Sequence, residues 1–147
     1  MDKDVFLQKG IEYLRLGDIP QAEENFRNAL KEDPNSTRAY NNLGVVLNMK
    51  GEFEEAEFFL RKGIEQNPEN ELAYNNLGLF LLEKKRFEEA EICFREIIDL
   101  NPNFSDAYNC LGVILRTKEK FDESGEMFYK AVKLNPFSTN ALANLGS

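Results

Sequence analysis

The sequence contains no histidine, no tryptophan and only two cysteines. Histidine is the commonest zinc ligand and general base in proteins, so its absence argues against a zinc site and against acid–base catalysis. Cys93 and Cys110 form neither a CxxC pair nor another metal-ligand spacing, and a glycine-rich phosphate loop is missing. We therefore expect no metal, no cofactor and no enzymatic activity, with both thiols reduced.

Basic residues are also scarce, at 18 against 26 acidic residues, which gives a formal net charge of -8. An acidic surface repels phosphate backbones, so nucleic acid is not an expected partner. A long uncharged segment is absent, and the first residues are acidic instead of leading into the apolar part of a signal peptide. We expect a cytoplasmic protein without membrane insertion, and its 42% hydrophobic content is enough for a folded core.

A period of 34 residues organises the chain and is carried by several columns of residue types. Proline marks it at Pro34, Pro68, Pro102 and Pro136. The same interval joins Gly10, Gly44, Gly78, Gly112 and Gly146, then Ala22, Ala56 and Ala90 with Ser124, and Phe26, Leu60, Phe94 and Phe128. The period predicts a single domain over residues 1–147, with repeats 3–36, 37–70, 71–104 and 105–138 and a partial repeat 139–147.

Each repeat is predicted to form two amphipathic helices, because its apolar residues recur at helical spacing on either side of a break. In the second repeat these residues are Tyr40, Leu43, Gly44 and Leu47 before Lys50, and Phe53, Ala56, Leu60 and Ile64 after Glu52. Gly44 and Ala56 are small, which indicates that the two helices approach each other closely there.

Capping and turn residues divide the helices. The Asn-Pro or Asp-Pro step ends each second helix, because proline lacks an amide hydrogen and restricts the residue before it. Ser36, Asn70 and Ser138 are expected to cap the next helix, and Ser105 is expected to do so one residue after Phe104.

A second set of residues occupies the turn inside each repeat. Gly17 and Gly51 suit a left-handed backbone there, and Lys85 and Glu119 replace them in the later repeats, at a cost of about 1 kcal/mol each if that conformation is required.

This pattern resembles the tetratricopeptide repeat over essentially the whole chain. The motif of the second repeat is Tyr40, Leu43, Gly44, Leu47, Ala56, Leu60, Gly63 and Pro68. The resemblance implies an all-α fold: a right-handed superhelical solenoid of antiparallel helix pairs, with four full repeats and the first helix of a fifth. The pentatricopeptide repeat, which reads RNA, is a weaker alternative, because its period is longer and this chain is acidic.

The resemblance also implies that the first helices line the concave side, and the residues opposite their core positions are unusual for a solvated face. Apolar side chains lie there where charges are typical, beside columns of carboxamides. The apolar set is Ile11, Val45, Leu79 and Val113, with Met49 on the same face. The amide sets are Gln8, Asn42, Asn76 and Asn144, and next to them Asn41, Asn75 and Asn109.

Two interpretations of this face stay open. In the first, carboxamides bind the backbone of an extended partner and the apolar column adds contact area. Similar asparagine ladders line the repeats of the O-linked N-acetylglucosamine transferases, where they hold substrate polypeptides. In the second, Val45 and its equivalents pack between neighbouring helices and the asparagines are only tolerated. Cys110 interrupts the amide column and is expected to be an inert filler, as is Cys93.

The basic clamp with which some family members hold the acidic tails of heat-shock chaperones is missing. Other residues occupy the places of its lysines and arginines: Leu7, Asn41, Leu72, Asn75, Asp106 and Cys110. We expect a scaffold that binds a protein or peptide, but not such tails, in the concave groove. The alternative is that the repeats recruit substrates for a larger enzyme such as an O-linked glycosyltransferase.

Two further surfaces are candidates for contacts. Phe58 and Ile92 either project from the convex side or pack against the following repeat. The last predicted helix is apolar at Leu142 and Leu145 and has no second helix to cover it. We therefore expect that the chain is part of a longer protein. We also expect weak self-association through this uncovered helix.

Overall fold

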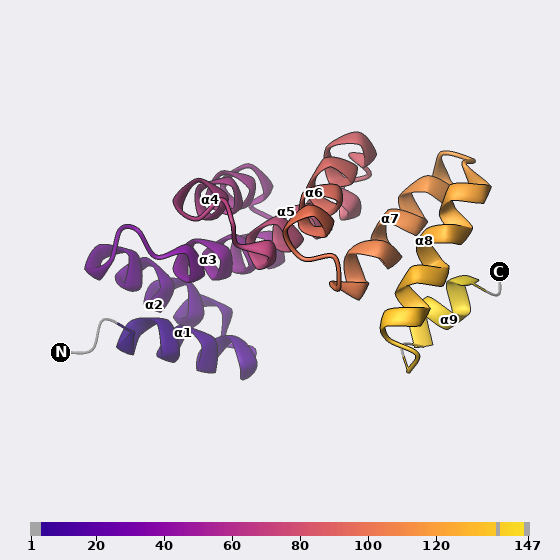
Figure 1. The fold of residues 1–147 in the computed structure, drawn as a ribbon. Coiled ribbons are helices and arrows are strands. Elements are labelled where there is room, and N and C mark those ends of the chain that lie inside the picture. The colour runs from indigo at the N-terminus through magenta and orange to yellow at the C-terminus, as the bar shows by residue number, and fades with distance from the viewer. Residues whose placement is uncertain (1–3, 138, 146–147) are drawn as a thin grey trace. The chain divides into compact units, whose positions relative to one another are not determined.

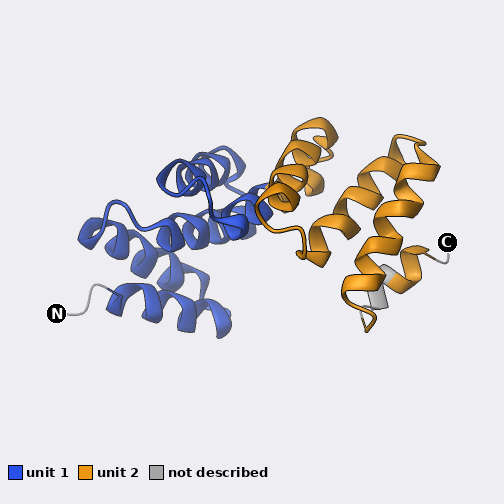
Figure 2. Ribbon diagram, viewed as in Figure 1, with its two compact units in different colours: residues 1–77 blue, residues 78–147 orange. Residues whose placement is uncertain are grey.

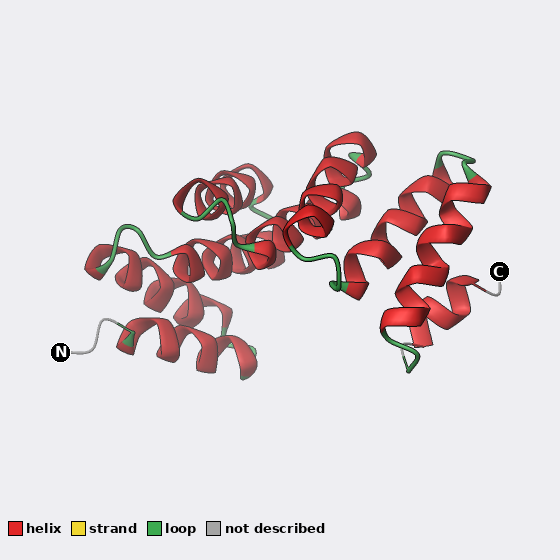
Figure 3. Ribbon diagram, viewed as in Figure 1, coloured by secondary structure: helices red, strands yellow, loops and turns green. Residues whose placement is uncertain are grey.

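The computed structural model describes residues 4–137 and 139–145, and these residues are helical with short connections and no strand (Figures 1 and 3). The helices are α1 (Val5–Arg15), α2 (Ile19–Glu32), α3 (Thr37–Met49), α4 (Phe53–Gln66), α5 (Glu71–Glu83), α6 (Phe87–Leu100), α7 (Ser105–Thr117), α8 (Phe121–Leu134) and α9 (Thr139–Leu145). Each full repeat contributes two helices, and α9 is the first helix of the partial repeat. The predicted all-α fold of paired helices is confirmed.

The chain forms two compact units, residues 1–77 and residues 78–147 (Figure 2). Unit 1 contains α1 to α4 and the beginning of α5, and unit 2 contains the rest of α5 and α6 to α9. In unit 1, α2 packs on both α1 and α3, and in unit 2, α8 packs on both α7 and α9. The single domain expected over residues 1–147 stays a prediction.

Close approach at a glycine holds the two helices of a repeat together. A Cβ atom added to Gly44 on α3 would lie 2.6 Å from Cγ of Leu60 on α4. In unit 2, a Cβ atom on Gly112 would lie 2.6 Å from Cε1 of Phe128. Leu60 and Phe128 are buried, so neither can move aside without opening the core. The predicted close approach at the glycine column is therefore confirmed.

Ser124 shows how a polar residue fits the small position that alanine occupies in the other repeats. Its side chain is 3% exposed, and its hydroxyl donates a hydrogen bond of 2.8 Å to the carbonyl oxygen of Gly112. The buried hydroxyl is thus satisfied, and the substitution costs the core little.

The helix caps agree with the sequence in two places and differ in one. Ser36 accepts a hydrogen bond of 3.2 Å from the amide of Ala39, and Asn70 accepts one of 3.2 Å from the amide of Ala73, as predicted. Ser138 lies outside the described residues. The prediction for Ser105 was wrong, because α7 begins at this residue and its N-cap is the preceding phenylalanine, whose side chain makes no capping bond.

The turn before each first helix explains that difference. Asn101 accepts a backbone hydrogen bond of 3.1 Å from Phe104, just as Asp33 does from Ser36 at 3.2 Å. The Asn101 side chain also accepts from the amide of Asn103 at 3.1 Å, which closes an Asx turn. This turn sets the first residue of the helix whatever side chain occupies the cap.

The turn inside each repeat has a left-handed residue, as expected. The φ angles are +81° at Gly17 and +85° at Gly51, and +62° at Lys85 and +64° at Glu119. For side chains with a Cβ atom this conformation is unfavourable. Lys85 and Glu119 are both exposed, so only the backbone geometry, and not packing, distinguishes them from glycine.

We predict that Lys85→Gly and Glu119→Gly each raise the free energy of unfolding by about 0.5–1 kcal/mol. Glycine removes the left-handed penalty of about 1–2 kcal/mol, and part of this gain is lost because glycine is more flexible in the unfolded chain. Gly51→Ala is the control and should lower stability by about 1 kcal/mol. Urea unfolding measures all three variants, and a loss of stability in Lys85→Gly would contradict the prediction.

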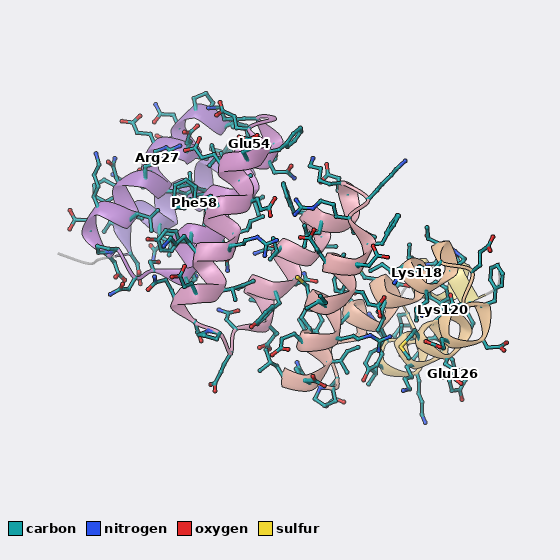
Figure 4. All side chains as sticks on the ribbon, turned by 90° about the horizontal axis from the view of Figure 1, so that it is seen from above. Arg27, Glu54, Phe58, Lys118, Lys120 and Glu126 are labelled. Atoms are coloured by element: carbon teal, nitrogen blue, oxygen red, sulfur yellow. The ribbon has the colours of Figure 1, made fainter. Side chains whose placement is uncertain are left out.

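Ion pairs join consecutive repeats at the same positions in both units. In unit 1, Glu23 on α2 lies 2.6 Å from Nζ of Lys50 at the end of α3 and 2.9 Å from Nε of Arg27. In unit 2, Glu91 on α6 lies 3.0 Å from Nζ of Lys118 and 2.9 Å from Nε of its own neighbour Arg95. Figure 4 labels Arg27 and Lys118. Each glutamate is therefore held between a cation of its own helix and one of the next repeat.

These contacts lower the pKa of both carboxyl groups. The hydrogen bond from Lys50 has the largest effect on Glu23 and holds its pKa below the ordinary value of 4.5. Partial burial alone would raise the pKa of Glu91, but hydrogen bonds from Arg95 and Lys118 outweigh it, so this pKa is lowered as well. The pairs therefore contribute stability that is fully present above the ordinary pKa and is lost as the pH falls through the lowered one.

We predict that the free energy of unfolding falls between about pH 6 and about pH 3, and that Glu91→Gln reduces this fall. The control is Glu126→Gln, because Glu126 is exposed and makes no ion pair within the described residues (labelled in Figure 4). Urea unfolding at both pH values compares the two variants with the unsubstituted chain. Equal pH dependence in all three proteins would show that the pair does not carry the effect.

Candidate functional site

The sequence-predicted site residues lie on first helices, which are α1, α3, α5, α7 and α9. Unit 1 carries eight of them, which we call the amide face of unit 1: Gln8, Ile11, Asn41, Asn42, Val45, Met49, Asn75 and Asn76. Unit 2 carries Leu79, Asn109, Val113 and Asn144. Within one helix, Asn41, Val45 and Met49 follow at intervals of four residues and so share one side of α3.

The aliphatic members of this set are only partly covered. Met49 is 59% exposed and Leu79 is 44% exposed, while Ile11, Val45 and Val113 are half-buried. Side chains that served only to pack helices together would be buried like Leu43 and Leu47, which are fully covered. A part of this apolar surface is therefore accessible to solvent in each unit.

The amide side chains turn their oxygen atoms toward the protein. Oδ1 of Asn41 and Oδ1 of Asn75 are buried and have no hydrogen-bond partner among the described residues, and Asn41 is only 6% exposed as a residue. In unit 2, Oδ1 of Asn109 accepts a hydrogen bond of 3.0 Å from Nδ2 of Asn144. The carbonyl oxygen is thus shielded from solvent in Asn41 and Asn75, and in Asn109 it already accepts a hydrogen bond.

Gly63 makes room for the Asn41 oxygen. A Cβ atom added to Gly63 on α4 would collide with Oδ1 of Asn41, which therefore occupies the volume of the missing side chain. The other repeats have Ala29, Ile97 and Ala131 at this position. The periodic pattern identified Gly63 as a motif position, but its pairing with Asn41 becomes visible only in the packed repeat.

The two cysteines are shielded. Cys93 is 6% exposed, and burial, followed by the negative charge of Asp106, raises the pKa of the Cys110 thiol from 9.0 to about 11. At neutral pH this thiol is protonated and weakly nucleophilic, as expected of a small apolar filler. Among the described residues, His, Cys, Asp and Glu do not gather in a group of three or more that could hold a metal.

The outer face of the first repeat carries polar residues where the other repeats are apolar. Lys9 occupies the position of Leu43, and Asn25 occupies that of Phe59. A cavity of about 550 Å³ lies between α1 and α2 on this face and is lined mainly by Phe6, Lys9, Glu12, Tyr13, Asn25 and Asn28. Lys9 is exposed, so its aliphatic stem can lie along α1 while its ammonium group stays in water.

Phe58 and Ile92 are exposed on their second helices, at 55% and 69%. The alternative that they pack against the following repeat is therefore wrong. Phe58, labelled in Figure 4, contacts the edge of Phe59 with ring centroids 5.2 Å apart, and Nζ of Lys62 lies 5.7 Å from its ring. Sequence periodicity places both residues on second helices but does not show which side chains a neighbour covers.

Helix pairs in a uniform 34-residue period, with glycine-mediated close approach and partly exposed first helices, define a helical-repeat interaction protein. The chain belongs to the tetratricopeptide-repeat family, whose sequence profiles match residues 7–70, 72–104 and 93–126. No protein with a curated description matches the sequence. None of the described helices is both long and apolar enough to cross a membrane.

Solved structures of repeat proteins resemble the chain. PilF of Pseudomonas aeruginosa is 32% identical with a TM-score of 0.91, over 97% of this chain and 65% of PilF, so the chain spans about two thirds of that protein. MamA of Desulfovibrio magneticus RS-1 is 22% identical with a TM-score of 0.85, over 99% of this chain and 83% of MamA. A tetratricopeptide repeat protein of Parabacteroides merdae is 20% identical with a TM-score of 0.84, over 97% of this chain and 57% of its own. The last two similarities show the fold alone.

Proteins of this family bind protein partners and are generally scaffolds without catalytic activity, so the chain is a protein-interaction scaffold in this general sense. The cytoplasmic location stays a prediction, as does the exclusion of chaperone tails.

We predict that Gly63→Ala lowers the free energy of unfolding by about 1–3 kcal/mol, because the new methyl group collides with the Asn41 amide. In an Asn41→Ala background the same change should cost less, which a double-mutant cycle measures by urea unfolding. Gly125→Ala is the control, since a Cβ atom there meets nothing within 4 Å and should stabilise α8 by about 1 kcal/mol. Equal costs of Gly63→Ala in both backgrounds would refute the proposed contact.

Proposed function

We propose that the chain holds an extended segment of a partner protein against the amide face of unit 1. The observation that carries this proposal is Asn41, a carboxamide only 6% exposed that makes no hydrogen bond with a described residue. An amide whose donors stay unpaired destabilises a fold, so a residue of this kind is better explained by binding through its NH2 group than by packing. The half-buried Val45 and the exposed Met49 beside it supply apolar contact area.

The composition of this face indicates which kind of ligand fits. Carboxamides bind a peptide backbone whatever its sequence, because they hydrogen-bond to groups that every residue of the backbone carries. Charged residues that would select a terminal carboxylate are absent from the clamp positions, where Leu7, Asn41 and Leu72 lie. The proposed ligand is therefore an internal extended segment, bound mainly through its backbone and through apolar side chains.

A panel of random ten-residue peptides displayed on phage tests the proposal. We predict that selection on the unsubstituted chain enriches peptides whose affinity falls by about tenfold or more in the double variant Asn42→Ala with Asn76→Ala, as measured by fluorescence titration. The melting temperature of this variant should change little, because both side chains are only partly buried.

Two results would count against this function. One is a selection that enriches no peptide, and the other is a set of enriched peptides that bind the double variant as tightly as the original chain. A matched loss of stability and affinity would instead support the packing interpretation. The control variant Glu126→Gln lies on a second helix outside the amide face and should leave peptide affinity unchanged.

Two finer expectations remain proposals. The exposure of Leu142 and Leu145 on α9, at 47% and 41%, supports weak self-association through this helix, which sedimentation at high concentration measures. A role as the recruiting arm of a larger enzyme is the alternative function.

A further inference from the structure

The amides on the first helices share an orientation that bears on ligand chemistry. An asparagine side chain carries one acceptor, the oxygen Oδ1, and an NH2 group at Nδ2 that can donate two hydrogen bonds. Both atoms are bonded to Cγ and point in different directions. In unit 1, Oδ1 of Asn41 and Oδ1 of Asn75 are both buried. Because the oxygen lies on the protein side, Nδ2 of each amide lies on the other side of the group.

The contact with Gly63 favours this orientation of Asn41 over the reversed one. The oxygen faces the backbone of Gly63, whose Cα hydrogens are weak hydrogen-bond donors to oxygen. Reversing the amide would place two N–H donors against these Cα hydrogens instead, and unpaired buried donors are costly. The packed repeat therefore fixes which end of the amide points outward.

Nδ2 of Asn41 and Nδ2 of Asn75 have no acceptor in the part of the chain that the structure describes. Neither nitrogen takes part in a hydrogen bond with a described residue, and only the oxygen of each side chain is enclosed without a partner. In unit 2, Asn109 reaches the same state by another route, because its oxygen accepts from Asn144. At three equivalent repeat positions, therefore, the amide oxygen is buried or already paired, and the NH2 group makes no hydrogen bond with a described residue.

We infer that these amides act on a bound segment only as hydrogen-bond donors, so the amide face of unit 1 recognises an extended backbone through its carbonyl oxygens. This inference rests on the proposed function and adds which side donates the hydrogen bonds and which side accepts them. A ligand contributes carbonyl acceptors to Asn41 and Asn75, and its own N–H groups are not required by this column. Segments rich in proline, which keep every carbonyl and lack N–H groups, are compatible with such a face.

The test uses one peptide enriched by the phage selection, synthesised in two altered forms. In the first form alternate amide nitrogens are methylated, which removes those N–H donors and keeps the carbonyl oxygens as strong acceptors. In the second form the same bonds are esters, which lack the same N–H groups and also have weaker carbonyl acceptors. The two forms differ in acceptor strength, and fluorescence titration compares their affinities with that of the parent peptide.

We expect the methylated peptide to bind within about threefold of the parent and the ester peptide to bind about threefold to tenfold more weakly than the methylated one. Equal losses in both forms, a loss only in the methylated form, or full affinity in both would overturn the inference. In each of these cases the parent peptide still binds, so the proposed function survives. Failure to enrich any peptide would overturn the proposed function itself.

A pair of variants with the same change of charge gives a second, independent measurement. Asn75→Asp keeps the shape and the oxygen of the side chain but replaces the donor with an acceptor, and Asn103→Asp adds the same charge at an exposed loop residue outside the amide face. We expect Asn75→Asp to bind the parent peptide about threefold to tenfold more weakly than Asn103→Asp does. Melting temperatures identify any loss of fold, and equal affinities in two folded variants would contradict the donor role.

Discussion

The close approach of two helices within each repeat is the constraint on which the rest of the structure depends. At Gly44 and Gly112 the absence of a side chain lets a buried Leu60 or Phe128 from the second helix enter the space. Dispersion and hydrophobic contacts then form along both helices, because interiors are packed at high density. A larger residue at either glycine would separate the pair, and the residues of the first helix would lose their fixed positions.

The junctions between repeats use a different interaction, which combines apolar packing with paired charges. Glu23 and Glu91 each bind a lysine from the following repeat and an arginine from their own helix. These residues are partly solvated, so the stability that each pair contributes above the ordinary pKa of its glutamate is modest. Apolar burial accompanies these charges, because Ala39 and Ala107 at the start of α3 and α7 are fully buried.

The amide face follows from both constraints. Since the second helix approaches closely, the first helix has one buried side and one side with partial exposure, and Asn41 lies at the border between them. A carboxamide at such a border can bury its oxygen and keep its NH2 group accessible. Gly63 completes the arrangement, because a side chain there would push the Asn41 amide outward and release its orientation. Gly63 therefore fixes which end of the Asn41 amide is buried.

The sequence by itself determined the repeat, its helix pairs and the positions of the left-handed turns, because these depend on local properties that recur every 34 residues: the glycine at Gly17 and Gly51, the proline after each second helix, and the spacing of apolar residues. It also placed the candidate residues on the first helices. The tertiary structure alone decided three further points. It showed that Phe58 is exposed, that the start of α7 is set by an Asx turn and not by Ser105, and that the Asn41 oxygen lies against Gly63. Each of these depends on atoms brought together by packing, and periodicity records which side of a helix a residue occupies but not which neighbour covers it or how its end groups are turned.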